Sequence, residues 1–280
     1  LEAYRSLKGR VDAAVPEMFS LLPKADFEIR PVEEFRQATT PGAHYMRPAP
    51  DGSRPGIFYV NTGGWENRTR AGSQALFIHE AVPGHHFQLA IQQQQEQLPF
   101  FRRVIPFTAY TEGWALYSER LAYEAGLYEG LPLRDFGRLA EEMKRAVRLV
   151  VDTGMHAKRW SREACIEYMT ANTPMAPADI ERQIKRYYVL PGQALAYKVG
   201  MLTILELRER AMEQLGDAFD IREFHDVVLK NGAVPMRVLE EVIDAYIKAK
   251  PHETIIGAQN CVCDLEELLD ETHTAKRGEN

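Results

Sequence analysis

The segment from His79 to His86 reads His-Glu-Ala-Val-Pro-Gly-His-His, and the proline–glycine pair inside it limits how the chain can fold there. Proline removes a backbone donor and clashes with the preceding helical turn, so a helix must kink, bulge or end at Pro83. Gly84 tolerates backbone strain that other residues do not. The segment therefore predicts two helical pieces joined by a break, with histidines on both sides of it.

Three imidazoles and one carboxylate within eight residues indicate a metal site or an acid/base site. Zinc hydrolases commonly carry His-Glu-x-x-His on one helix, where the two histidines bind the metal. Here His85 follows His79 by six residues, and a bulge of two residues would return it to the position of the second ligand. The alternative is His86, which on an unbroken helix faces the same side as His79 but lies roughly 10 Å along the axis. We favour His85 over His86.

Glu80 directly follows the first histidine and would act as the general base that takes a proton from a water molecule. A third ligand is expected from Glu112, which begins a helix in an otherwise apolar stretch. Glu119 is seven residues later on the same helical face, so we expect it behind the ligands, holding an imidazole N–H. These residues together predict a site for one Zn²⁺ ion.

The composition excludes several classes of protein. The chain has 280 residues, of which 45% are hydrophobic and 26% charged, as is typical of a soluble globular protein. A net charge of −6 argues against a nucleic-acid-binding surface, which would be basic. No apolar run reaches the roughly 18 residues that a membrane-spanning helix needs. Three cysteines cannot build a disulfide framework.

Helical periodicity dominates the chain from about residue 68 onward. We expect helices over residues 3–22, 73–80, 87–95, 110–125, 133–160, 161–171, 177–190, 191–215, 219–230 and 235–248. Within residues 26–62, two short strands at 27–30 and 57–60 flank a Pro/Gly-rich passage at 41–55 that we expect to be loop. The prediction is a mainly α (α+β) protein with one domain at 1–250, which includes the strand and loop region 26–62, and a polar tail at 251–280.

Further polar residues are candidates for the chemistry. Peptide hydrolysis passes through a tetrahedral oxyanion, which a tyrosine or histidine beside the metal can stabilise. The candidates for that role are Tyr187, Tyr197 and His156. Asp152 is four residues before His156 on the same helical face, so this pair would orient an active-site imidazole or satisfy a buried polar group.

Three residues are candidates for contact with a substrate. Arg186 and Lys198 could bind a substrate carboxylate, or they could form ordinary salt bridges. The strand at 57–60 could offer its edge to an extended peptide, which would place Asn61 near the cleft. The remaining histidines are isolated in the sequence and receive no role: His44, His225, His252 and His273.

Four motifs, in order along the chain, resemble the bacterial DUF885 family. Residues 79–86 match its His-Glu-x-x-Pro-Gly-His-His, and residues 112–117 match its Glu-Gly-Trp-Ala-Leu-Tyr. Residues 152–156 resemble its Asp-Thr-Gly-x-His, and residues 186–194 its Arg-Tyr-x-x-x-Pro-Gly-Gln-Ala. The resemblance covers about residues 1–250 and implies a gluzincin-like zinc-peptidase domain, mostly helical with a small sheet near the site. The segment 112–119 is also similar to the helix of M1 aminopeptidases whose first glutamate binds zinc. Family members are often much longer, which implies that this chain is a catalytic half.

The sequence thus predicts a zinc metallopeptidase whose partner is a peptide substrate. The alternative is a catalytically inactive helical protein that binds a metal or a peptide. A di-metal oxidase is disfavoured, because that site needs paired Glu-x-x-His motifs and no histidine here has a glutamate three residues before it. The sequence predicts no oligomeric state. Its location would be the bacterial cytoplasm, or the periplasm or envelope if a leader was removed.

Overall fold

The computed structural model describes residues 1–64 and 70–250, so the predicted tail at 251–280 lies outside the described residues. The helices are α1 (Glu2–Met18), α2 (Ser73–Glu80), α3 (His85–Gln93), α4 (Phe100–Val104), α5 (Thr108–Glu124), α6 (Pro132–His156), α7 (Arg162–Asn172), α8 (Pro177–Val189), α9 (Ala196–Leu215), α10 (Ile221–Leu229) and α11 (Met236–Ala249). Short 3₁₀ helices are η1 (Glu34–Arg36), η3 (Gln193–Leu195) and η4 (Gly216–Ala218). The strands are β1 (Phe27–Pro31), β2 (Ala43–Met46) and β3 (Gly56–Val60). The prediction of a mostly helical chain with a small sheet is confirmed.

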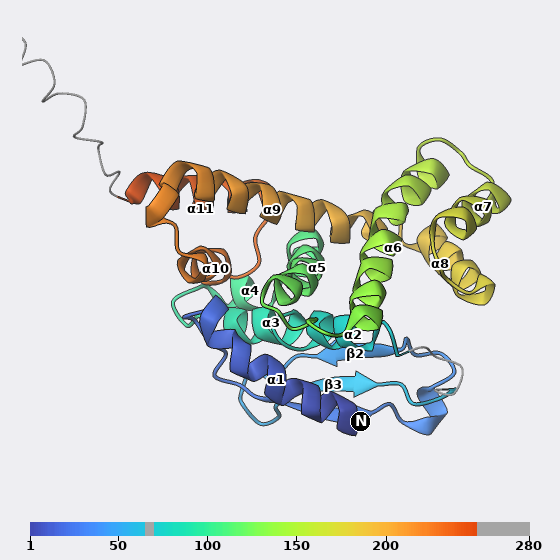
Figure 1. The fold of residues 1–280 in the computed structure, drawn as a ribbon, viewed down its shortest axis with the longest axis horizontal. Coiled ribbons are helices and arrows are strands. Elements are labelled where there is room, and N and C mark those ends of the chain that lie inside the picture. The colour runs from blue at the N-terminus through green and yellow to red at the C-terminus, as the bar shows by residue number, and fades with distance from the viewer. Residues whose placement is uncertain (65–69, 251–280) are drawn as a thin grey trace, which may run out of the picture.

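The elements are arranged in layers (Figure 1). The strands and α1 lie together at the bottom of the view, and α2 and α3 lie above them. Helix α5 occupies the centre and packs extensively against α9, which runs across the top. Helix α6 leads from α2 to α7 and α8, which form a lobe at the side. The layers therefore bring α2, α3 and α5, which carry the predicted metal ligands, into one contiguous region.

The sheet is mixed, with the strand order β1-β3-β2. Strand β1 pairs with β3 in parallel, and β2 pairs with β3 antiparallel. The two predicted strands are confirmed, but the prediction that all of 41–55 is loop is wrong, because 43–46 form β2. The prediction of an open edge at 57–60 is also wrong, since β3 is paired on both sides. That strand has no free backbone groups to offer to a peptide.

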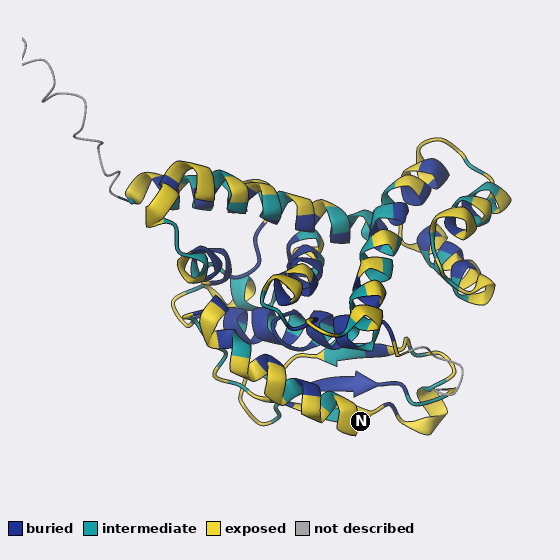
Figure 2. Ribbon diagram, viewed as in Figure 1, coloured by how far each residue is buried: buried dark blue, intermediate teal, exposed yellow. Residues whose placement is uncertain are grey.

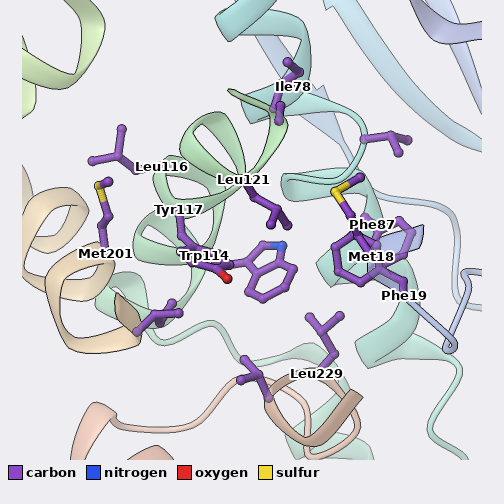
Figure 3. Packing of buried hydrophobic residues seen from close by; sticks show 14 of the residues in the cluster. Met18, Phe19, Ile78, Phe87, Trp114, Leu116, Tyr117, Leu121, Met201 and Leu229 are labelled. Atoms are coloured by element: carbon purple, nitrogen blue, oxygen red, sulfur yellow. The ribbon is translucent and has the colours of Figure 1, made fainter. Parts of the chain in front are cut away.

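The main core surrounds Trp114, which is fully buried on α5 (Figure 3). Its neighbours Phe19 and Phe87 come from the segment after α1 and from α3, so the core joins segments far apart in the sequence. A second, smaller core lies among α6, α7 and α8, where residues such as Val151 and Ile184 are buried. The inner faces of the helices are buried and their outer faces exposed (Figure 2). Packing of amphipathic faces accounts for this pattern.

Two glycines let α5 and α9 approach each other closely. A Cβ added at Gly200 would lie 1.9 Å from the carbonyl oxygen of Ala109, and one added at Gly113 would lie 2.5 Å from the backbone of Gly200. No side chain larger than hydrogen fits at either position without movement of a helix. This contact sets the distance between α9 and α5, the helix that carries Glu112.

Candidate metal centre

The predicted break lies between α2 and α3, and α5 holds it in place. The peptide bond before Pro83 is cis. The carbonyl oxygen of Pro83 accepts hydrogen bonds from Trp114 Nε1 at 2.8 Å and from Ser118 Oγ at 3.3 Å. The backbone N–H of Gly84 donates to the carbonyl oxygen of Ile78 at 3.0 Å. The break is therefore a built turn whose buried carbonyl group is satisfied by α5.

Gly84 is required for a reason that the sequence did not indicate. Its φ is −78°, so the turn does not use the left-handed freedom of glycine. A Cβ at this position would instead lie 2.0 Å from the carbonyl oxygen of His79 and 2.3 Å from that of Ile78. The turn folds back so tightly on the end of α2 that only glycine fits.

The turn brings three potential ligands together: His79, His85 and Glu112. The Nε2 atoms of both histidines point toward one oxygen, Glu112 Oε2, at 3.5 Å from His79 and 3.3 Å from His85. One ligand atom from each residue can be chosen so that all three lie within 4.8 Å of one another. Glu112 Oε2 is buried and has no hydrogen-bond partner within the described part of the chain. Two nitrogens and an unsatisfied carboxylate oxygen form a donor set that suits Zn²⁺.

Charges around the triad favour a cation between the rings. Burial alone would raise the pKa of Glu112, but its contacts with His79 and His85 hold that pKa well below its usual value. Burial would lower the pKa of His79, but Glu112 and Glu119 outweigh it and raise the pKa to about 9. The two carboxylates therefore stabilise positive charge at this point, whether a proton or a metal ion carries it.

Glu119 lies where the sequence placed it, behind the first histidine. Its Oε1 accepts a hydrogen bond from His79 Nδ1 at 2.8 Å, and its side chain is only 2% exposed. With the proton on Nδ1, the lone pair of His79 Nε2 faces the other two ligand residues. A carboxylate that holds the distal nitrogen of a metal-binding histidine in this way fixes its tautomer and ring orientation.

His86 lies outside the triad. Its Nδ1 is hydrogen-bonded to the hydroxyl of Tyr45 at 2.8 Å, and its ring packs 4.6 Å from that of Phe27. Burial lowers the pKa of this imidazole to about 4, so it is neutral at physiological pH. The structure thus points His85 toward the other two ligands and His86 toward the sheet.

Glu80 ends α2 next to His79 and is partly exposed, so it can reach solvent. A histidine that the sequence left without a role lies near it. Burial lowers the pKa of His44, and the charge of Glu80 acts in the opposite direction. His44 is on β2 and stacks on Tyr59 with ring centroids 5.0 Å apart. This neighbour was missed because β2 itself was not expected.

Of the two predicted tyrosines, only Tyr197 lies beside the triad. Its ring is 6.1 Å from that of His79 and nearly parallel to it, at 19°. Tyr187 is buried in the smaller core, where its hydroxyl accepts a hydrogen bond from Arg148 Nε at 2.9 Å. Tyr187 therefore braces α8 against α6 and does not contact the triad.

The predicted pair of Asp152 and His156 does not form. His156 Nε2 is hydrogen-bonded to the backbone carbonyl of Tyr187 at 2.9 Å. The carboxylate of Asp152 accepts from the backbone N–H of Gly192 at 3.1 Å. Both side chains connect the end of α6 to the end of α8 and the residues after it. Each one bonds to a backbone group there instead of to the other side chain. Neither acts behind the metal ligands.

Asn61 is not available to a substrate. It is buried, and its Nδ2 donates to the carbonyl oxygens of Gln37 and Thr40, both at 2.8 Å. Its oxygen accepts from the backbone N–H of Gly63 at 2.9 Å. The residue anchors the loops around β3, and the prediction that it binds substrate is not supported by its position.

Arg186 and Lys198 already have partners of their own. Arg186 Nη2 donates to the side-chain oxygen of Gln193 at 3.2 Å. Lys198 Nζ forms an ion pair with Glu142 at 2.6 Å. The contact of Lys198 matches the salt-bridge alternative. Arg186 bonds to a neutral amide and has no carboxylate partner among the described residues.

Helix α6 contributes two buried cations that the sequence did not single out. The guanidinium groups of Arg145 and Arg148 lie over the ring of Tyr197, at 5.8 and 4.8 Å from its centroid. Nothing in the local sequence distinguishes them from surface arginines of an amphipathic helix.

Within residues 1–64 and 70–250, no helix is both long enough and apolar enough to cross a membrane.

Solved structures that are similar to this chain include two that are described as putative lipoproteins. One is described as a putative lipoprotein from Colwellia psychrerythraea, with 48% identity and a TM-score of 0.87 over 89% of this chain and 43% of that one. The other, described as a putative lipoprotein of unknown function from Shewanella oneidensis, has 24% identity and a TM-score of 0.74 over 86% of this chain and 45% of that one. The second likeness supports the fold alone. The chain therefore spans less than half the length of either structure.

Comparison with curated proteins gives no significant match. The family model described as "Bacterial protein of unknown function (DUF885)" matches residues 1–243, which is most of the chain. The motifs around the triad lie within this matched region. The chain therefore belongs to the DUF885 family.

Proposed function

We propose that the protein is a zinc-dependent peptidase, with one zinc ion held by His79, His85 and Glu112. The observation that carries this proposal is the convergence of both histidine Nε2 atoms on a buried, unsatisfied oxygen of Glu112. Three protein ligands leave a further position open, as in catalytic zinc sites. A bound zinc ion would lower the pKa of a water molecule toward about 7 and polarise a substrate carbonyl group.

The neighbouring side chains have complementary roles in this proposal. Glu80 takes a proton from the attacking water and passes it to the leaving amine. Glu119 keeps the proton of His79 on Nδ1, so that Nε2 stays available as a ligand. Tyr197, beside His79, is the candidate donor to the oxyanion of the tetrahedral intermediate.

The substitution Glu80→Gln tests the proposal. It removes the base but leaves the three ligands, so we expect about 10²- to 10⁴-fold slower hydrolysis with zinc content unchanged. Hydrolysis of a peptide library would be followed by mass spectrometry, and zinc by elemental analysis of dialysed protein. The matched control is Glu206→Gln on the exposed face of α9, which should retain full activity.

Each result has a distinct meaning. Turnover of Glu80→Gln at the wild-type rate would remove Glu80 from the mechanism. Wild-type protein that holds no zinc would refute the metal site. Zinc without hydrolysis of any peptide would support the alternative, a metal-binding protein without catalysis.

We also infer that the protein acts at the cell envelope. Support comes from the structure from Colwellia psychrerythraea, which is 48% identical to this chain and is described as a putative lipoprotein. Fractionation of cells that produce the full-length protein would test this, and recovery in the cytosolic fraction would contradict it.

A further inference from the structure

Helix α6 carries three buried arginines, and one of them has no carboxylate partner among residues 1–64 and 70–250. Arg138, Arg145 and Arg148 are 6%, 6% and 5% exposed. Arg138 forms an ion pair with Asp135 at 2.7 Å, and Arg145 forms one with Glu141. No carboxylate of the described chain lies within 4.0 Å of Arg148. This arginine is therefore a mostly buried cation without an ion-pair partner among the described residues.

The contacts that Arg148 does make are neutral. Its Nε donates to the hydroxyl of Tyr187 and its Nη2 to Gln183 Oε1, both at 2.9 Å. Its Nη1 makes no hydrogen bond to any described residue. Asp152, one turn further along α6, is engaged by the backbone N–H of Gly192. Because a buried charge costs several kcal/mol without a counter-charge, the position calls for an anion.

The free donor lies close to the candidate metal centre. The guanidinium carbon of Arg148 is 4.8 Å from the ring centroid of Tyr197, and that centroid is 6.1 Å from the ring of His79. The guanidinium is thus at most about 11 Å from His79, a distance that roughly three residues of extended chain cover at 3.3–3.6 Å each. A peptide whose scissile bond lies at the triad could place its C-terminus here.

We propose that Arg148 binds the C-terminal carboxylate of a peptide, so that the enzyme removes one to a few residues from the C-terminal end. The proposal rests on the peptidase function proposed above. A planar guanidinium with a free N–H matches a carboxylate in charge and geometry. Of the other cations considered, Lys198 pairs with Glu142 and Arg145 with Glu141. Arg186 also has no carboxylate partner among the described residues, but it is less deeply buried than Arg148.

The test uses two mixtures of N-acetylated tetrapeptides of random sequence, one with a free C-terminal carboxylate and one with a C-terminal amide. Wild-type protein with zinc should cleave the free acids about 100-fold faster, because the amide leaves the buried guanidinium without its partner. Mass spectra of the products should show cleavage at a fixed distance from the C-terminus. Arg148→Gln should reduce the preference for the acid to less than about 5-fold, while Arg148→Lys should keep part of it.

Control variants separate binding from folding. Arg182→Gln changes an exposed arginine of α8 that pairs with Asp179, and it should keep the preference. Melting curves and zinc content would show whether the Arg148 variants are folded, and Arg148→Lys serves as the test if Arg148→Gln is not. Calorimetry with Glu80→Gln protein gives a readout without turnover. A peptide that the wild-type protein cleaves should bind to this variant more tightly with a free C-terminal carboxylate than with a C-terminal amide.

The outcomes distinguish this proposal from the one on which it rests. Equal cleavage of acids and amides, or an undiminished preference for the acid in every folded Arg148 variant, would overturn the role of Arg148 and leave the peptidase intact. Absence of cleavage in both mixtures would overturn both proposals.

Discussion

The substitution Gly84→Ala tests how the turn between α2 and α3 builds the candidate metal centre. The added methyl group would lie 2.0 Å from the carbonyl oxygen of His79 and 2.3 Å from that of Ile78. Both atoms belong to the helical backbone, so neither can rotate away as a flexible side chain would. The turn must open by roughly 1 Å, and this movement pushes His85 away from His79.

The stability cost follows from the same geometry. Overpacking of a well-packed site costs about 1–3 kcal/mol, and a clash with backbone lies at or above the upper end of that range. A matched control is Gly9→Ala on α1, where the added Cβ meets no atom within 4 Å apart from the adjoining backbone of its own helix. There the better helix propensity of alanine should increase stability by about 0.5–1 kcal/mol. The same chemical change should therefore differ in effect by about 4 kcal/mol between the two sites.

Urea unfolding of both variants would measure this difference, and zinc titration would report on the ligands. Gly84→Ala should unfold at lower urea and bind zinc more weakly, while Gly9→Ala keeps wild-type zinc affinity. If Gly84→Ala matched Gly9→Ala in both measurements, close backbone approach would not be the reason for glycine in the turn. That result would refute the claim that a Cβ at position 84 clashes with the end of α2.

Two further predictions concern the histidines. Glu119→Gln should weaken zinc binding about 10- to 100-fold in competition with a chelator, because a neutral amide accepts the hydrogen bond from His79 Nδ1 more weakly than a carboxylate and makes Nε2 a weaker ligand. Unchanged affinity would contradict a role for the charge of Glu119. His86 has a pKa of about 4 in the folded protein against 6.5 for an unperturbed histidine, so its protonation favours unfolding and its contribution to stability is lost as pH falls from about 6.5 to 4. Between pH 7.5 and 4, wild-type protein should lose about 3 kcal/mol more unfolding free energy than His86→Gln, as measured by urea unfolding, and equal losses would argue against a neutral buried imidazole.

The parts of the fold that depend on local pattern were predictable from the sequence. The long helix expected at 133–160 is α6, Pro132–His156, because its apolar residues recur at helical spacing. Strand β2 was not predictable in this way. Its four residues lie in a Pro/Gly-rich stretch, and its pairing with β3 comes from tertiary contact. The helix expected at 191–215 is α9, which begins only at Ala196 because Gly192 adopts a left-handed φ of 80° before it.

The candidate site divides along the same line. Proline and glycine interrupt a helix wherever they occur, so the sequence could predict the break and favour His85 over His86. In the structure, His85 faces His79 and Glu112, and His86 faces Tyr45. The pair Asp152 and His156 has equally suitable spacing, yet each side chain found a closer backbone partner that no spacing rule reveals. Arg148 is the extreme case, because what marks it is that no carboxylate of the described residues lies within 4.0 Å. A missing counter-charge is a property of the packed interior, and it can be recognised only once every neighbour has been placed.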